Sequence, residues 1–251
     1  MELKFIHMSD IHLFAKNYEY GDVQYNTNDL FEAAVEKFHT NHDDVDFLLI
    51  SGDLVDNGSV EGYEYLKNTL ENRWHKPVYL CLGNHDNREN FNKVFLEKNS
   101  NSPYYYMKPL PFGETCLITL DSGKFNPWMG IIDCEQLKWL EETAANIDLP
   151  IILMLHHPPF LGVDMDSFKF QLNNSQDIYD ILKCKNIVAI CSGHVHGAYS
   201  YRLGQFPVFT AEGTGFGLNF AKDHSTIATD ERGYNFCILN EGNVLVKRIR
   251  F

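Results

Sequence analysis

Five short apolar runs of this chain each lead directly into residues of the kinds that bind metal ions. The five junctions are Leu3–Met8 into Asp10 and His12, Phe47–Ile50 into Gly52 and Asp53, Val78–Leu82 into Gly83-Asn84-His85-Asp86, Ile151–Leu155 into His156-His157, and Val188–Cys191 into Gly193-His194-Val195-His196. In an open parallel sheet, ligands bind beyond the carboxyl ends of the strands, so these ends can deliver their side chains to a single crevice. The junctions therefore favour a fold in which several parallel strands end at one shared site.

The segments between these runs have the pattern of an α/β protein. One expected helix is capped by Asn28 or Asp29 and runs to about His39, and a second is capped by Ser59. Three more helices are expected at Glu89–Lys98, Cys134–Asn146 and Gln176–Cys184. Further strands are expected at Tyr104–Met107, Thr115–Leu120, Ala198–Arg202, Pro207–Ala211, Tyr234–Leu239 and Val244–Ile249. We therefore expect an α/β fold of two stacked mixed β-sheets with helices on the outer faces, in a single domain over residues 1–251.

The charge balance and the apolar runs limit the partners and the compartment of the chain. It has 21 basic and 34 acidic side chains and a net charge of −13, which disfavours a duplex nucleic acid or an anionic membrane as partner. No apolar run reaches the roughly 18 residues of a membrane span, and the N-terminus lacks the apolar segment of a signal peptide. We therefore expect a cytoplasmic protein, and nothing in the sequence indicates its oligomeric state.

The chain has six cysteines and no C-x-x-C pair; they are Cys81, Cys116, Cys134, Cys184, Cys191 and Cys237. Most of them lie inside apolar runs, where a free thiol behaves as a small hydrophobic side chain. We therefore expect reduced cysteines that are buried in the core.

The polar residues at the junctions favour a two-metal site. Asp10 with His12, and His194 with His196, are spaced i, i+2, which in extended backbone places both side chains on the same side. Histidine with carboxylate oxygen suits Mn, Fe, Zn, Co or Ni, and the lack of cysteine in the set argues against a closed structural zinc site. Seven candidate ligands exceed what one tetrahedral ion can use; they are Asp10, His12, Asp53, Asn84, His156, His194 and His196. Two divalent or mixed-valence ions, about 3.5–4 Å apart and bridged by a carboxylate, fit this set better.

The ordered blocks resemble those of the calcineurin-like metallophosphoesterases. In this chain they are Asp10-x-His12, Gly52-Asp53-x4-Gly58, Gly83-Asn84-His85-Asp86, His156-His157-Pro158 and Gly193-His194-x-His196. The resemblance implies a β-sandwich flanked by helices, with one ion held by Asp10, His12, Asp53 and His196 and the other by Asp53, Asn84, His156 and His194. It also implies that His85 is similar to the family's catalytic histidine. The Gly-His-Val-His form, followed by Gly204-x2-Pro207-Val208, looks most like the class III cyclic-nucleotide phosphodiesterase branch.

The expected reaction is hydrolysis of a phosphate ester, in which a water bridging the two ions loses a proton and attacks phosphorus. His85 would then protonate the leaving oxygen, and Asp86 would orient the imidazole of His85. His157 has two possible roles. It either contacts the substrate or supports the metal ligands from behind, or it simply packs against Pro158. Arg88, the only Lys or Arg among the blocks and their flanks, is either a substrate contact or a solvated residue at the start of a helix.

The scarcity of cations near the blocks favours a phosphodiester, which is a monoanion, over a dianionic monoester. The loops Ser122–Gly130, Phe160–Asn174 and Gly213–Gly233 are expected to rim the crevice. Their aromatic residues either stack on a nucleobase or pack beneath the loops; they are Phe125, Trp128, Phe160, Phe168, Phe170, Phe216 and Phe220. The segment after Thr210 carries no recognisable motif.

Three functions fit the sequence. The first is a phosphodiesterase for small diesters of the cyclic-nucleotide or glycerophosphodiester type, acting with two metal ions. The second is a phosphomonoesterase or nucleotidase on the same site. The third is a non-catalytic binding module, which we disfavour because such a protein would be expected to lose ligands, and here the set is complete.

Overall fold

The computed structural model describes residues 2–14, 19–20, 23–24, 26–123, 128–160, 170–220 and 226–251. Its first large sheet has five strands in the order β15-β14-β1-β4-β5. They are β1 (Leu3–Met8), β4 (Phe47–Ser51), β5 (Val78–Cys81), β14 (Gly233–Asn240) and β15 (Asn243–Arg250). Strands β1, β4 and β5 are parallel, and β14 pairs antiparallel with β1, so the late strands complete the sheet that the first strand begins.

The second large sheet has six strands in the order β10-β11-β9-β8-β7-β6. They are β6 (Tyr106–Pro109), β7 (Cys116–Thr119), β8 (Ile151–Met154), β9 (Ile187–Ser192), β10 (Ser200–Leu203) and β11 (Phe206–Thr210). The four central strands are parallel, and the two edge strands β6 and β10 are antiparallel to their neighbours. Two short hairpins add β2 (Glu19–Tyr20) with β3 (Val23–Gln24), and β12 (Gly217–Phe220) with β13 (Thr226–Thr229).

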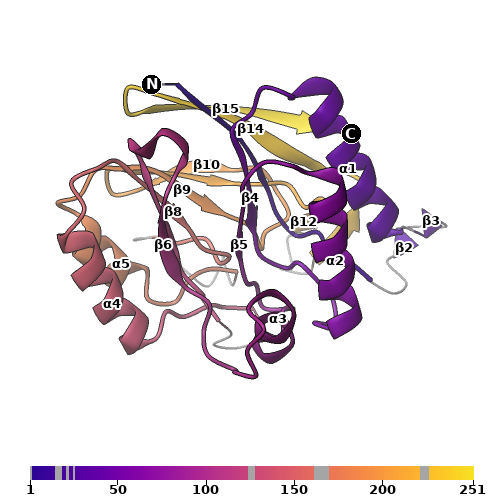
Figure 1. Cartoon of the computed structure of the whole chain (residues 1–251), viewed down its shortest axis with the longest axis horizontal. Helices are drawn as coiled ribbons and strands as arrows, with labels where there is room; N and C mark the ends of the chain where they lie inside the picture. The colour runs from indigo at the N-terminus through magenta and orange to yellow at the C-terminus, as the bar shows by residue number, and fades with distance from the viewer. Residues whose placement is uncertain are drawn as a thin grey trace.

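The helices lie outside the two sheets (Figure 1). One side carries α1 (Thr27–Asn41), α2 (Val60–Arg73) and α3 (Arg88–Phe95), and the other carries α4 (Cys134–Ala145) and α5 (Ser175–Leu182); a short 3₁₀ turn covers Pro111–Gly113. Four of these helices begin at a side chain that accepts hydrogen bonds from backbone N–H groups of the first turn, namely Asn26, Ser59, Asn87 and Asp133. Within the described ranges, no helix is both long and apolar enough to cross a membrane.

Alternate residues of the central strands face different apolar layers. Phe5 and Phe47 stack with ring centroids 5.0 Å apart in the layer between the two sheets. Ile6 and Leu48 point the other way, into the layer beneath α1 and α2. Because these strands are buried on both faces, their sequences are nearly continuous apolar runs. The expected two stacked mixed sheets with outer helices are therefore confirmed.

Several local expectations differ from the structure. Helix α1 is capped by Asn26 rather than by Asn28 or Asp29, whose backbone N–H groups donate to the Asn26 side chain. Strands β6 and β10 begin two residues later than expected, and the two short hairpins were not expected.

The expectation that the cysteines are buried is wrong for two of them. All six cysteines are free, but Cys134 and Cys184 are exposed. Cys134 is the first residue of α4, and Cys184 follows the end of α5. Both have charged neighbours, Asp133 and Glu135 beside Cys134 and two lysines beside Cys184, so neither lies inside an apolar run as the buried cysteines do.

We predict that Leu49→Ala lowers the free energy of unfolding by about 2–5 kcal/mol, because Leu49 is fully buried between the two sheets. The matched control is Leu245→Ala on the edge strand β15, where the side chain is 59% exposed and a change within about 0.5 kcal/mol is expected. Urea unfolding followed by circular dichroism measures both, and equal losses would contradict the layer assignment.

Candidate metal centre

The carboxyl ends of β1, β4, β8 and β9 converge on one buried point between the two sheets. The backbone N–H of Asp10 donates to the Gly52 carbonyl at 3.1 Å, and the N–H of Gly193 donates to the His156 carbonyl at 3.0 Å. The N–H of His194 reaches both carboxylate oxygens of Asp10, at 3.1 and 3.0 Å, and so ties the two sheets together. The expected convergence of strand ends is therefore present.

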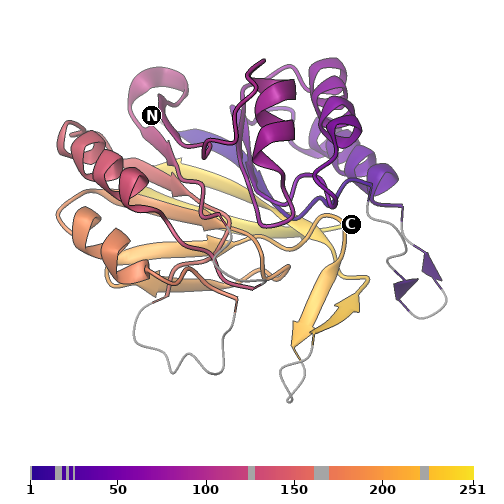
Figure 2. The ribbon, with the colours of Figure 1, turned by 90° about the horizontal axis from the view of Figure 1, so that it is seen from below.

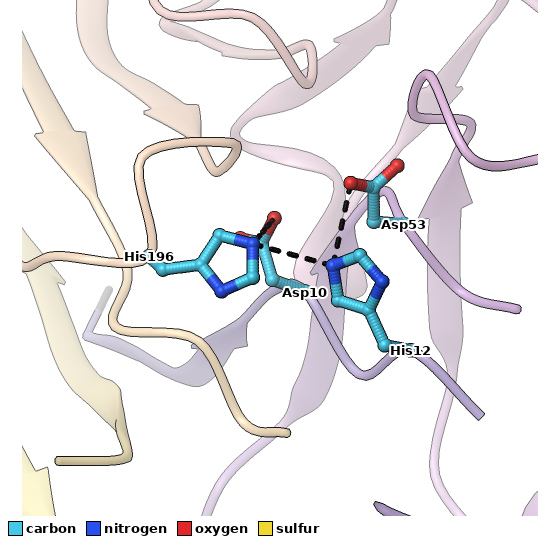
Figure 3. A group of neighbouring side chains, drawn as sticks. All are labelled: Asp10, His12, Asp53 and His196. Atoms are coloured by element: carbon cyan, nitrogen blue, oxygen red, sulfur yellow. Dashed lines mark hydrogen bonds and ion pairs between the residues drawn. The ribbon is translucent and has the colours of Figure 1, made fainter. Parts of the chain in front are cut away.

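Asp10, His12, Asp53 and His196 form a buried group in which one ligand atom from each lies within 4.8 Å of the others. His196 Nε2 is 3.3 Å from Asp10 Oδ1, and His12 Nε2 is 3.5 Å from Asp53 Oδ2 (Figure 3). The two imidazole Nε2 atoms are 3.2 Å apart. Two carboxylates and two imidazoles that point at one another in this way suit a cation among them.

Asp53, His156 and His194 form a second buried group and share Asp53 with the first. His156 Nε2 lies 3.3 Å from Asp53 Oδ2 and 4.0 Å from Asp10 Oδ1. Asn84 lines the same cavity as Asp53 and His194. Among the described residues, the Oδ1 of Asn84 is buried without a hydrogen-bond partner, and the Nε2 of His156 faces only the carboxylates of Asp53 and Asp10. Such atoms are costly unless something binds them, so the residues present fit a second cation.

Each of the four histidines in the two groups uses one ring nitrogen for a hydrogen bond to the protein. His156 Nδ1 donates to the Ser51 carbonyl at 2.7 Å, and His12 Nδ1 donates to Asp56 Oδ1 at 3.0 Å. His196 Nδ1 donates to the Phe216 carbonyl and His194 Nε2 to the Trp128 carbonyl, both at 2.8 Å. This arrangement fixes each ring and leaves its other nitrogen for a metal, as is usual for metal-binding histidines.

The backbone at these residues is left-handed rather than extended. The φ angles are 53° at Asp10, 48° at His12, 50° at Asp53, 70° at His194 and 46° at His196. The expectation that extended backbone brings each i, i+2 pair together is therefore wrong, because the strands end before the ligands begin. Gly83 permits the close approach, since a Cβ there would overlap the Asp53 carboxylate.

Burial and the two carboxylates set the protonation of the histidines. Burial lowers the pKa of His194 to about 3 and that of His196 to about 4, so both are neutral and ready to bind a metal. Burial also acts on His156, but the charges of Asp53 and Asp10 outweigh it and raise the pKa to about 9. Without a cation, His156 therefore carries the positive charge that balances Asp53.

His85 is held by Asp56 and not by Asp86. His85 Nδ1 donates to the Asp56 carbonyl at 3.0 Å and lies 3.4 Å from Asp56 Oδ1. The Asp86 carboxylate instead accepts from the backbone N–H groups of Leu54, Val55 and Gly83 and from the hydroxyl of Tyr63. The expectation that Asp86 orients the imidazole is therefore wrong.

Asp56 is a further residue of the site that was not expected from the sequence. Its carboxylate bonds to His12, and its carbonyl bonds to His85. The available signal was its position three residues after Asp53 in the same glycine-bounded block.

Arg88 donates from Nε and Nη2 to the two oxygens of the buried Asp121, both at 2.9 Å. The interpretation of Arg88 as a solvated residue is therefore wrong, and Asp121 already balances its charge. His157 is buried, its Nδ1 lies 2.7 Å from Ser122 Oγ, and its ring centroid is 4.3 Å from that of His194. His157 thus sits behind a candidate ligand; whether either residue serves the substrate stays a prediction.

A cavity of about 250 Å³ opens above the two groups. It is lined by His12, Asp53, Asn84, His85, Trp128, Phe170, His194, His196, Phe216, Leu218, Thr226 and Ala228. Of the aromatic loop residues, Trp128, Phe170 and Phe216 therefore reach the cavity, whereas Phe160 stacks on Tyr201 with centroids 4.1 Å apart. Phe125 and Phe168 lie outside the described residues, as does the side chain of Phe220.

The segment after Thr210 also belongs to the site. The N–H groups of Thr214 and Gly215 donate to the carbonyls of Ser9 and Asp10, each at 3.0 Å. Leu218 and Ala228 then bring the β12–β13 hairpin to the cavity.

A sandwich of two sheets carries, at its strand ends, two linked Asp/His groups that could hold metal ions. The family described as calcineurin-like phosphoesterase matches residues 3–198. The chain therefore belongs to the calcineurin-like phosphoesterase family and is a phosphoric ester hydrolase.

Relatives and solved structures agree with this assignment. A probable cyclic nucleotide phosphodiesterase of Fibrobacter succinogenes is 34% identical over 68% of this chain and 65% of its own length. A probable glycerophosphodiester phosphodiesterase of Arcobacter nitrofigilis is 30% identical over 82% of this chain and 76% of its own. The fold is similar to that of a dimetal phosphatase from Danio rerio, with a TM-score of 0.72, 15% identity, and coverage of 99% of this chain and 96% of that one.

We predict that Asp53→Ala abolishes metal binding in both groups, because Asp53 is the residue they share. Elemental analysis of the purified variant measures this directly. The matched control, Asp29→Ala on the exposed face of α1, should keep the metal content of the parent protein. Two metals still bound to Asp53→Ala would contradict the shared role.

Removal of metal should destabilise the protein, since cations that bind only the folded state stabilise it by mass action. At free metal about 100 times the dissociation constant, the midpoint of thermal unfolding should fall by about 5–10 °C on chelation. Differential scanning calorimetry with and without a chelator measures the shift. Asp53→Ala should show no such shift, and an equal shift in both proteins would argue against metal at this site.

Proposed function

We propose that the chain is a phosphodiesterase that binds two cations. One is held by Asp10, His12, Asp53 and His196, and the other by Asp53, Asn84, His156 and His194. The observation that carries this proposal is that the two buried groups share Asp53 and open into one cavity. We propose manganese or iron as the cations, with zinc, cobalt or nickel as alternatives, because imidazole with carboxylate oxygen suits these metals.

Cations bound there would supply Lewis-acid stabilisation of charge on the phosphoryl oxygens and lower the pKa of a water. The protein's part is to orient the ester and to move a proton. His85 lines the cavity and gives its Nδ1 hydrogen bond to Asp56, which leaves Nε2 to protonate the leaving oxygen. Burial lowers the pKa of His85, but Asp56 and Asp53 outweigh it and raise the pKa to about 9, so the ring carries this proton at neutral pH.

The preference for a diester rests on charge. Among the described residues, no Lys or Arg lines the cavity, and the guanidinium of Arg88 is already paired with Asp121. A dianionic monoester would normally require such donors. The relatives named as probable cyclic nucleotide and glycerophosphodiester phosphodiesterases support the same preference.

We also propose that residues 1–251 act as one domain, which the pairing of β14 with β1 supports. A cytoplasmic location is supported by the six free thiols, since unpaired cysteines are usual in reducing compartments.

With added manganese, bis(p-nitrophenyl) phosphate should be hydrolysed faster than p-nitrophenyl phosphate. Release of nitrophenol measures both rates under the same conditions. A faster monoester would replace the proposal with a phosphomonoesterase or nucleotidase. Turnover of neither ester would favour a binding module.

His85→Ala should lower kcat about 10²-fold or more on a diester with a poor leaving group, because such a leaving oxygen needs a proton. Both metals should remain bound, since His85 belongs to neither of the two proposed ligand sets, and elemental analysis checks this. The control is His75→Ala, at an exposed histidine outside the cavity. Unchanged turnover of His85→Ala would remove this residue from the mechanism.

A further inference from the structure

Two glutamates at the ends of one segment beside the metal centre pair with arginines of the last strand. The segment begins at Glu212, carries the β12–β13 hairpin and ends at Glu231. Its partners are Arg248 and Arg250 of β15. We call these four residues the arginine clamp. None of the four belongs to the candidate ligand groups or lines the cavity above them.

Glu212 is the buried member of the clamp. Its side chain is 2% exposed, and Arg250 Nε donates to its two oxygens at 3.0 and 3.4 Å. Arg248 forms a second ion pair with the same carboxylate. A buried carboxylate is costly without a cationic partner, and two neighbouring guanidinium groups repel each other without an anion between them. The three side chains therefore hold one another in place.

The clamp also holds the chain that follows the hairpin. Glu231 forms an ion pair with Arg250 at 2.5 Å, and the Phe251 N–H donates to the Arg232 carbonyl at 3.4 Å. The hairpin projects from the body of the molecule, and the C-terminus lies near its base (Figure 2). Strand β15 therefore fixes both ends of the 212–231 segment without itself lining the cavity.

The first residues of this segment contact two candidate ligands of the same metal group. The Gly215 N–H donates to the Asp10 carbonyl at 3.0 Å. The Phe216 carbonyl accepts the hydrogen bond from His196 Nδ1 at 2.8 Å. Glu212 lies only three and four residues before these two contacts, so the position of its carboxylate limits where they can lie.

The chain between Glu212 and these contacts is closely packed. Gly213 forms a parallel bridge with Ser9. A Cβ on Gly213 would overlap the Phe216 carbonyl oxygen and come within 2.7 Å of His196 Nδ1. Because no space separates this backbone from the imidazole, a shift of Glu212 moves His196 instead of being absorbed along the way.

The histidines of the second metal group are oriented by other parts of the chain. The Ser51 carbonyl accepts from His156, and the Trp128 carbonyl accepts from His194. Both carbonyls lie outside the 212–231 segment. A change in the clamp should therefore act on one cation much more than on the other.

We propose that Glu212, together with its two arginine partners, is a positioning residue for one of the two cations. That cation is the one held by the group that contains Asp10 and His196. The inference rests on the two-cation centre of the proposed function. It makes a contact of the C-terminal strand, outside the cavity, a determinant of how tightly the protein binds metal.

Titration of the metal-free protein with Mn²⁺ tests this role, with bound metal measured by equilibrium dialysis and elemental analysis. The parent protein should bind two ions. Glu212→Gln keeps the size of the side chain but removes the charge between the two guanidinium groups. One ion should bind more weakly on the order of tenfold, the lower end of the range for loss of a group that orients a metal ligand, and the other should stay within about twofold.

Two background variants identify the affected ion. His196→Ala removes a ligand of the first group, so Glu212→Gln should change the affinity for the remaining ion by less than about twofold. His156→Ala removes a ligand of the second group, and here Glu212→Gln should still weaken the remaining ion on the order of tenfold.

Two controls separate positioning from the loss of an ion pair as such. Glu32→Gln breaks the pair of Glu32 with Arg73, 2.9 Å apart between α1 and α2, and should leave both Mn²⁺ affinities within about twofold. Glu231→Gln removes the exposed carboxylate of the clamp, beyond the hairpin, and should have equally little effect.

Arg250 provides a second test in case Glu212→Gln does not fold. Arg250→Ala leaves Arg248 to balance the buried carboxylate, and it should weaken the same ion. Arg250→Lys keeps the positive charge and should restore part of the affinity.

The outcomes distinguish this inference from the proposed function. Equal weakening of both ions by Glu212→Gln, an equal loss in Glu32→Gln, or unchanged binding in both the Glu212 and the Arg250 variants would overturn the positioning role and leave the two-cation centre intact. A parent protein that binds fewer than two Mn²⁺ ions would overturn the two-cation centre itself.

Discussion

The metal centre depends on a backbone conformation that most residues avoid. Five candidate ligands, Asp10, His12, Asp53, His194 and His196, have positive φ, which costs a residue with a side chain on the order of 1–3 kcal/mol. Such strain persists only where the surroundings determine it. Here main-chain hydrogen bonds hold it, from Asp10 N–H to Gly52 and from His12 N–H to Asp53, at 3.1 and 2.9 Å. Hydrogen bonds between the segments that follow the neighbouring strands β1 and β4 thus help to keep these side chains facing one another.

Much of this arrangement could be predicted because its signals are local. A strand buried on both faces is a continuous apolar run, and the polar residues that follow it mark its carboxyl end, so the ends of β1, β4, β8 and β9 could be recognised. The route by which the ligands meet could not be predicted. An i, i+2 spacing is compatible with extended and with left-handed backbone, and only the hydrogen bonds made by the folded chain decide between them.

Several parts of the site that could not be predicted act through backbone carbonyl groups, which every residue has. The carbonyls of Ser51, Trp128 and Phe216 orient three histidines, and no side chain records that role. The segment after Thr210 lacked a motif for this reason, although it runs beside Asp10. Long-range pairing explains the error at Arg88, because its partner Asp121 lies 33 residues away and no local pattern connects them. Asp56 is a different case, because its position three residues after Asp53 can be seen in the sequence.

The bonds from Thr214 and Gly215 to Ser9 and Asp10 have a consequence for how the protein matures in the cell. Ribosomes add about 5–20 residues per second, so residues 9–10 emerge roughly 10–40 s before the residues that brace them. The bonds from Asp10 and His12 to Gly52 and Asp53 can form early, but the bonds from Thr214 and Gly215 can form only when the chain is nearly complete. The metal site is therefore incomplete in the growing chain. The nearly complete protein, and not the nascent chain, selects among the metals of the cell.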